Sequence, residues 1–162
     1  MELQKINFAK FNYPLCLLLE GNSDTWYSLL SVIKDLTPDQ LAYKHSGSNL
    51  RTIAEMINHA LDTQYSFYTQ NLILGQPYKQ LYSDLPKTVE EAQKRIGDTF
   101  TKIVELWQDL KPQDFTKEIK TEWGQPLTSE LALFQSITHT HYHVSEICFL
   151  RGLGGFPTKA MG

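Results

Sequence analysis

The sequence predicts an all-α protein, a four-helix bundle with a crossover connection between its second and third helices. Four long segments repeat apolar residues every three or four positions, which is the period of an amphipathic α-helix. Prolines and helix-capping residues mark the ends of these segments. The connection after the second segment is long enough to run across a bundle instead of turning back at once.

The composition is that of one globular domain, residues 1–162. Hydrophobic residues make up 41% and charged residues 20%, far from the signature of a disordered chain. The net charge is −3 and the basic residues are scattered, so nucleic acid is not an expected partner. No apolar run is long enough to suggest a membrane span or a signal peptide. Cys16 and Cys148 lie in apolar surroundings, which predicts buried, reduced thiols in a cytoplasmic protein.

The first helix is expected from Leu15 to Leu36. Its apolar residues keep the helical spacing through Gly21. Because Pro14 is tolerated only in a first turn, the residues before it form either an irregular arm or a separate short helix. The sequence Thr37-Pro38-Asp39-Gln40 then predicts a short helical turn that Thr37 caps.

The second helix is expected from Leu50 to Leu74. This stretch contains neither proline nor glycine, and Gly75 closes its apolar stripe. The linker from Gly75 to Lys87 follows, and its length allows the crossover.

The third and last helices have clear boundaries. The capping sequence Thr88-Val89-Glu90-Glu91 predicts the start of the third helix, whose heptad-like repeat continues to Leu110. Residues 119–123 alternate in polarity, but a glycine and a proline follow so soon that no sheet is expected. The last helix is expected from Thr128 to Arg151, where three closely spaced glycines stop it.

Three histidines lie close together in the last helix, in His139-Thr140-His141-Tyr142-His143. Around a helix, His143 lies about 40° and Glu146 about 20° from His139, whereas His141 lies about 200° away. His139 and His143 can therefore reach one ion about 2 Å from each ring, with a third ligand from elsewhere. His59, beside the apolar stripe of the second helix, is the best candidate, because His45 belongs to a polar loop.

The same pattern fits other interpretations. Histidines four residues apart can form an exposed polar face, and a lone helical histidine can be a satisfied core residue. The zinc-protease motif His-Glu-x-x-His is absent, because Thr140 follows His139. Glu146 can accept a proton, bind a coordinated water or orient His143, or it can be a solvated carboxylate.

Other side chains near these positions receive no role. Glu55 and Asp62 flank His59 at helical spacing, but such carboxylates are common surface charges. Aromatic residues at helical spacing more often build a core than a substrate pocket. The aromatic residues considered are Trp26, Tyr65, Phe67, Trp107, Trp123 and Tyr142.

Two stretches carry a resemblance to a known family. One is Ile57-Asn58-His59-Ala60, and the other runs from His139 to Ile147 and on to Leu150-Arg151-Gly152-Leu153-Gly154. In these stretches and in its four-helix pattern, the sequence resembles the DinB/YfiT-like family of helical metalloproteins. The family often has Arg-Gly-Gln-Ile after its last ligand, whereas this chain has Val144-Ser145-Glu146-Ile147, which leaves the chemistry of the pocket open.

The resemblance implies a divalent metal on His59, His139 and His143 in a bundle that is often homodimeric. Zinc is the first expectation and nickel the second. Three protein ligands leave a position for water or substrate. The expected activity is a metal-dependent transferase that activates a small thiol, with Glu146 as the candidate catalytic residue and a small molecule as substrate. The alternatives are a metal-dependent hydrolase that uses metal-bound water and a non-enzymatic metal- or ligand-binding stress protein.

Overall fold

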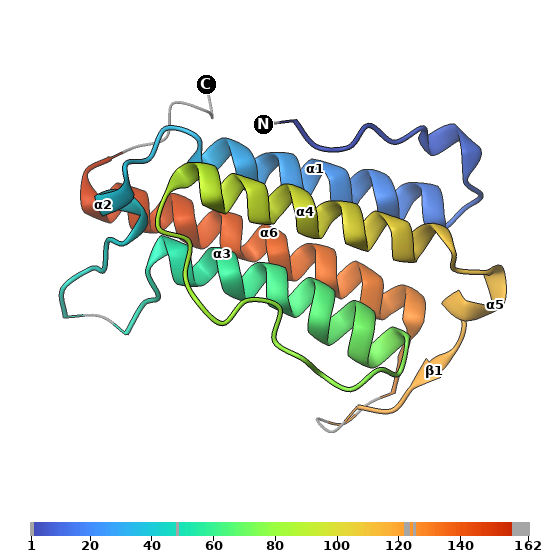
Figure 1. The fold of residues 1–162 in the computed structure, drawn as a ribbon. Coiled ribbons are helices and arrows are strands. Elements are labelled where there is room, and N and C mark those ends of the chain that lie inside the picture. Colours follow the sequence, from blue (N-terminus) through green and yellow to red (C-terminus); the bar gives the residue numbers. More distant parts are fainter. Residues whose placement is uncertain (1, 48, 122–123, 125, 157–162) are drawn as a thin grey trace.

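Four long helices pack side by side in the computed structural model, which describes residues 2–47, 49–121, 124 and 126–156 (Figure 1). This arrangement confirms the predicted all-α four-helix bundle. The long helices are α1 (Leu15–Ile33), α3 (Ile53–Asp62) with its continuation η2 (Thr63–Ile73), α4 (Val89–Gln108) and α6 (Ser129–Gly154). The short helices are η1 (Phe8–Lys10), α2 (Pro38–Leu41) and α5 (Pro112–Phe115). Among the described residues, no helix is both long and apolar enough to cross a bilayer.

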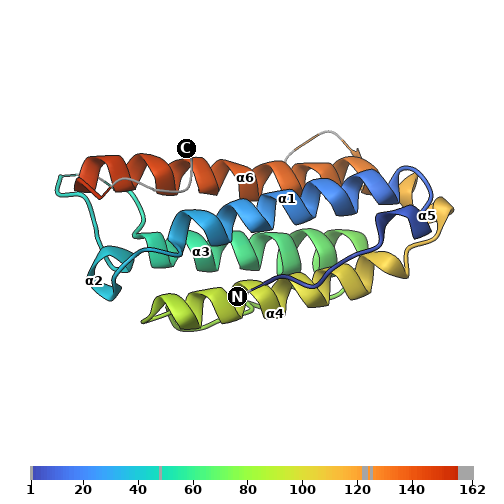
Figure 2. The same ribbon diagram turned by 90° about the horizontal axis from the view of Figure 1, so that it is seen from above.

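The predicted crossover is present between η2 and α4. The connection returns along the length of the bundle, so that α3 and α4 run in the same direction (Figures 1 and 2). The side chain of Asn58 donates to the carbonyl of Asp84 at 2.6 Å, and the Leu81 amide donates to the Asp62 carboxylate at 2.7 Å. Residue numbers rise along the connection as they fall along α3, which shows that the connection lies antiparallel against that helix.

Threonine caps set the starts of three long helices. The Thr52, Thr88 and Thr128 hydroxyls each accept a backbone N–H three residues ahead, at 3.1 to 3.2 Å. Helix α6 ends where Gly155 adopts a left-handed φ of 72°. It therefore runs past the predicted end at Arg151, because the two helical glycines before Gly155 do not interrupt it.

The second long helix is not α-helical throughout, so the prediction of one α-helix to Leu74 is wrong in its second half. Residues 63–73 form a π-helix, in which the Thr69 hydroxyl donates to the Gln64 carbonyl at 2.8 Å. The Trp107 indole donates to the same hydroxyl at 3.1 Å, and the Trp26 indole donates to the Gln64 side chain at 2.6 Å. In this π-helix, Gln64 and Thr69 are therefore buried inside the bundle, where each bonds with a buried indole.

Two further predictions need correction. Residues Glu118–Ile119 (β1) pair antiparallel with Leu127–Thr128 (β2), although no sheet was expected. Ile119 and Leu127 face each other in this short ladder and are both buried, so packing stabilises it where the local sequence does not. Cys16 and Cys148 are free thiols, as expected, but they are half-buried instead of buried.

Candidate metal centre

Three imidazoles from two helices converge inside the bundle. His59 comes from α3, and His139 and His143 come from successive turns of α6. One nitrogen of each ring lies within 4.8 Å of the others, and Nε2 of His143 is 3.3 Å from Nε2 of His139. The ring centroids are 4.5 to 5.3 Å apart. The structure thus brings together the three histidines that the sequence singled out.

Glu146 holds the His143 ring from behind. Its Oε2 lies 2.6 Å from Nδ1 of His143, so the ring donates Nδ1–H to the carboxylate. That bond leaves the Nε2 lone pair of His143 directed toward His139. His59 has a weaker support, because its Nδ1 is 3.5 Å from the Thr63 hydroxyl. Glu146 therefore lies where a carboxylate orients a metal-binding histidine.

The surroundings keep the three imidazoles neutral. Burial is the largest cause in each case and lowers the pKa of His59, His139 and His143. The charges of the neighbouring histidines add to the effect at His139, whose pKa falls to about 4. The Glu146 hydrogen bond partly opposes burial at His143, while the positive charge of Arg51 lowers the pKa of all three rings. Neutral imidazole is the form that binds a metal ion.

The donor set fits one transition-metal ion. Two nitrogen ligands about 2.0 to 2.1 Å from a tetrahedral ion lie about 3.3 Å from each other. The Nε2 atoms of His139 and His143 have that separation. Imidazole suits zinc, nickel, copper and iron, so the donor set indicates the class of metal and not its identity. Three ligands also leave one tetrahedral position open.

A cleft of about 420 Å³ gives access to the histidines from one side. Its lining includes His59 and His139, whereas His143 is buried behind them. Side chains from the end of α3, from η2 and from the crossover form the rest of the wall. They are Asp62, Thr63, Phe67, Tyr68 and Tyr78. A molecule in this cleft would therefore contact His59 and His139, and not the buried His143.

The other histidines take no part in the cluster. His141 is exposed on the outer side of α6, as the helical angles predicted. His45 belongs to the loop after α2, where its ring bonds with the Tyr43 hydroxyl at 3.0 Å. Helical periodicity was therefore sufficient to separate His139 and His143 from His141.

Several neighbouring residues have roles that the sequence did not reveal. Glu55 caps α3 by accepting the Thr52 amide at 2.7 Å, and Asp62 accepts hydrogen bonds from the crossover. Trp26 and Trp107 are buried core residues, as expected, whereas Phe67 lines the cleft and Tyr142 is exposed. Trp123 lies outside the described residues. The aromatic run at 65–68 was the available signal for a pocket wall.

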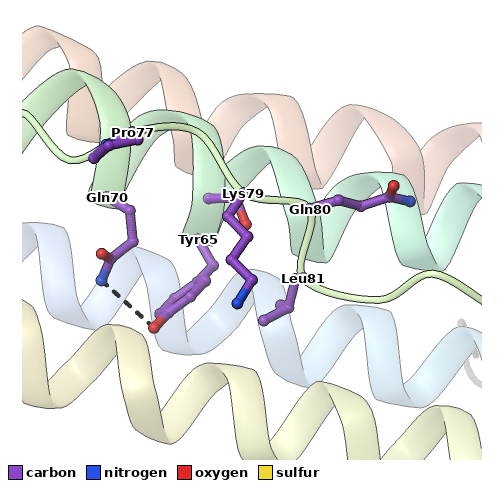
Figure 3. Close-up of a pocket in the computed structure, with 7 residues that line it drawn as sticks. Tyr65, Gln70, Pro77, Lys79, Gln80 and Leu81 are labelled. Carbon is purple, nitrogen blue, oxygen red and sulfur yellow. Dashed lines mark hydrogen bonds between the residues drawn. The ribbon is translucent and has the colours of Figure 1, made fainter.

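A second pocket lies between η2 and the crossover (Figure 3). It has a volume of about 280 Å³ and is lined by residues of η2 and the crossover, without a histidine. On the η2 wall, Tyr65 accepts a hydrogen bond from Gln70 at 3.4 Å. On the other wall, the Lys79 side chain extends from the crossover beside Tyr65 (Figure 3). This pocket and the histidine cleft share no lining residue.

Comparison with known proteins links the cluster to a family. The model of the DinB superfamily matches residues 22–147, a range that contains all three histidines and Glu146. No curated protein matches the chain in sequence.

Three solved structures share the fold at low sequence identity. YfiT from Bacillus subtilis, described as a probable metal-dependent hydrolase with an unusual four-helix bundle topology, aligns with a TM-score of 0.70 and 16% identity over 96% of each chain. A DinB-like protein from Bacillus cereus aligns with a TM-score of 0.68 and 17% identity over 90% of this chain and 94% of that one. A conserved protein from Enterococcus faecalis aligns with a TM-score of 0.59 and 17% identity over 88% of this chain and 98% of that one.

Proposed function

The chain belongs to the DinB superfamily, and from this premise we propose that it is a metal-dependent transferase whose ion is held by His59, His139 and His143. The observation that carries the proposal is the convergence of three neutral imidazoles, two of them at the spacing of ligands to one tetrahedral ion. His59 and His139 line a cleft large enough for a small molecule. This combination is typical of a metal site that performs chemistry.

In the proposed site, the three histidines bind the ion and Glu146 positions one of them. An ion bound to three imidazoles supplies a Lewis-acid centre that lowers the pKa of a coordinated water or thiol toward 7. Glu146 fixes the tautomer and the orientation of His143, so it acts as a positioning residue. His59 and His139 border the cleft, so an ion held by the three rings would be accessible to a molecule bound there.

The two carboxylates near the histidines, Glu146 and Asp62, already accept hydrogen bonds, and this favours a thiol as the nucleophile. In the part of the chain that the structure describes, Glu146 is bonded to His143, and Asp62 accepts hydrogen bonds from Tyr78 and Leu81. Both carboxylates are therefore already engaged in structural hydrogen bonds. A thiol with a pKa of about 8.5 ionises near neutral pH with little help, whereas water, with a pKa of about 15.7, depends on the ion for the whole of its activation.

A metal-dependent hydrolase is the second candidate, and the description of YfiT favours it. Metal-loaded protein should be tested with a panel of esters and amides and with electrophiles offered together with small thiols. Thiol-dependent product formation supports the transferase, and hydrolysis without thiol supports the second candidate. Tight metal binding without turnover on either panel would instead indicate a non-enzymatic metal-binding protein.

Metal content is the first test of the site. Zinc is the proposed ion and nickel the second choice, because imidazole binds both and cellular availability decides. Protein purified without a metal-affinity tag should contain about one equivalent of transition metal by elemental analysis. Less than about a tenth of an equivalent, unchanged after reconstitution, would overturn the metal site.

We also propose that the protein is a cytoplasmic homodimer. The outer side of α6 exposes Leu131, Phe134, Tyr142, Phe149 and Leu153, and it carries no charged residue among its exposed positions from 131 to 153. An uncharged row of large apolar side chains is a common feature of protein interfaces. The free Cys16 and Cys148 are consistent with a reducing compartment. Sedimentation equilibrium of the wild type and of Phe149→Glu tests the dimer, which the introduced charge should weaken.

A further inference from the structure

Aromatic side chains line the cleft next to the histidine cluster. The Tyr68 ring centroid lies 6.5 Å from that of His139, and the Phe67 ring packs edge-on against Tyr68 at 5.2 Å and 76°. Both residues are half-buried on η2 and line the cleft. The wall beside the cluster is therefore largely aromatic.

Tyr78, on the crossover, contributes a third ring to the cleft. Its hydroxyl donates to Asp62 at 2.5 Å, while the other oxygen of Asp62 accepts the Leu81 amide at 2.7 Å. One carboxylate thus fixes two points of the crossover beside α3. The Asp62 hydrogen bond raises the pKa of Tyr78 to about 12, and burial raises the pKa of Tyr68, so both phenols stay uncharged at neutral pH.

We propose that the cleft selects small molecules with a metal-binding head and a flat apolar body that lies against Phe67, Tyr68 and Tyr78. The proposal rests on the proposed metal site, which binds the head. The cleft volume of about 420 Å³ falls within the usual range of about 300 to 1,000 Å³ for small-molecule sites. Aromatic walls favour planar apolar groups through burial and edge or face contacts.

The pocket between η2 and the crossover provides a contrast. Lys79 and Gln80 line it, and it contains no histidine (Figure 3). A molecule with a metal-binding head gains nothing from that pocket. The apolar body is therefore assigned to the histidine cleft, where the head and the rings are contiguous.

Two hydroxamates that share one metal-binding head test the proposal. Acetohydroxamate carries a methyl group, and benzohydroxamate carries a phenyl ring. Their dissociation constants for zinc-loaded protein are measured by calorimetry. Benzohydroxamate should bind about tenfold more tightly, a preference that Phe67→Ala and Tyr78→Ala should reduce to about twofold or less. Acetohydroxamate affinity should stay within about twofold in both variants, since the head contacts are retained.

Tyr27→Ala is the matched control, because Tyr27 is an exposed tyrosine on α1 that does not line the cleft. This variant should keep the full preference. Tyr78 is 53% exposed, so its substitution is tolerated even if Phe67→Ala fails to fold. Equal binding of the two hydroxamates, or a preference that survives Tyr78→Ala, overturns this inference alone. Failure to load zinc overturns the proposed function and this inference with it.

Discussion

Glu146 Oε2 lies 2.6 Å from Nδ1 of His143, and the opposite nitrogen of the same ring lies 3.3 Å from Nε2 of His139. A carboxylate, a buried imidazole and a second imidazole are thus arranged in one line on one helix. Glu146 therefore supports the His143 ring and does not line the cleft.

Replacing Glu146 should weaken metal binding without abolishing it. The Glu146→Gln variant keeps an acceptor for His143 Nδ1–H but loses the charge that raises the basicity of the ring. Metal affinity should fall about 10- to 100-fold, as measured by competition with a chelator. Glu130→Gln, on the same helix but in its first turn, should leave the affinity unchanged. An unaltered affinity in Glu146→Gln would show that the hydrogen bond does not support the site.

Single histidine variants should separate ligands from bystanders. His59→Ala, His139→Ala and His143→Ala each remove one of three donors, so bound metal should fall below about a tenth of an equivalent after dialysis. His141→Ala removes an exposed histidine from the same helix and should retain the wild-type content. Elemental analysis provides the measurement. Retention of metal by all three cluster variants would mean that the ion binds elsewhere.

Acidification should destabilise the metal-free protein. The pKa of His139 is about 4 in the folded protein, below its ordinary value of 6.5. Between these pH values the unfolded chain binds more protons, so the free energy of unfolding should fall as the pH is lowered from 6.5 toward 4. The pKa values of His59 and His143 are also lowered, and they add to the effect with the same sign.

Urea denaturation in the presence of a chelator, at about pH 7 and pH 5, measures this dependence. His139→Asn should reduce the loss of stability on acidification, and His141→Asn should not. An identical loss in the wild type and His139→Asn would contradict the assignment of the effect to this ring.

Removal of the Asp62 carboxylate should loosen the crossover. Asp62→Ala deprives the Leu81 amide and the Tyr78 hydroxyl of their acceptor. The Leu81 amide should then exchange with deuterium at least about tenfold faster, because local opening no longer breaks a hydrogen bond to a charged group. Asp98→Ala removes an exposed carboxylate of α4 and serves as the control. Unchanged exchange at Leu81 would show that other contacts hold the connection.

The buried Gln64 side chain should contribute strongly to stability. It accepts the Trp26 indole N–H at 2.6 Å and donates to Asn22 Oδ1 at 2.5 Å. Gln64→Ala removes these bonds and leaves a cavity, and although the Trp26 indole still donates to Asn22 Oδ1 at 2.9 Å, the loss should cost about 1 to 3 kcal/mol in total. Urea denaturation should show this loss, whereas Gln70→Ala on the same π-helix should change the stability little. A loss of similar size in both variants would contradict a special role for the Gln64 bonds.

The sequence by itself determined the helices and the orientation of the histidine pair in α6. Threonine caps and a period of 3.6 residues act within a few residues along the chain, so they are readable without the fold. For the same reason, helical angles placed His139, His143 and Glu146 on one side of α6 and His141 on another. The length of the linker after Gly75 was enough to anticipate a crossover.

Only the tertiary structure decided which groups meet across helices. The packing of α3 against α6 brings His59 to the pair, and the His143 hydrogen bond selects one of several roles open to Glu146. The π-helix arises because Trp26 and Trp107, distant in sequence, pair with inward-facing polar groups of that segment. Asp62 acquires its role only when the crossover returns to it. Each of these outcomes depends on contacts between separate segments, which local periodicity and capping do not encode.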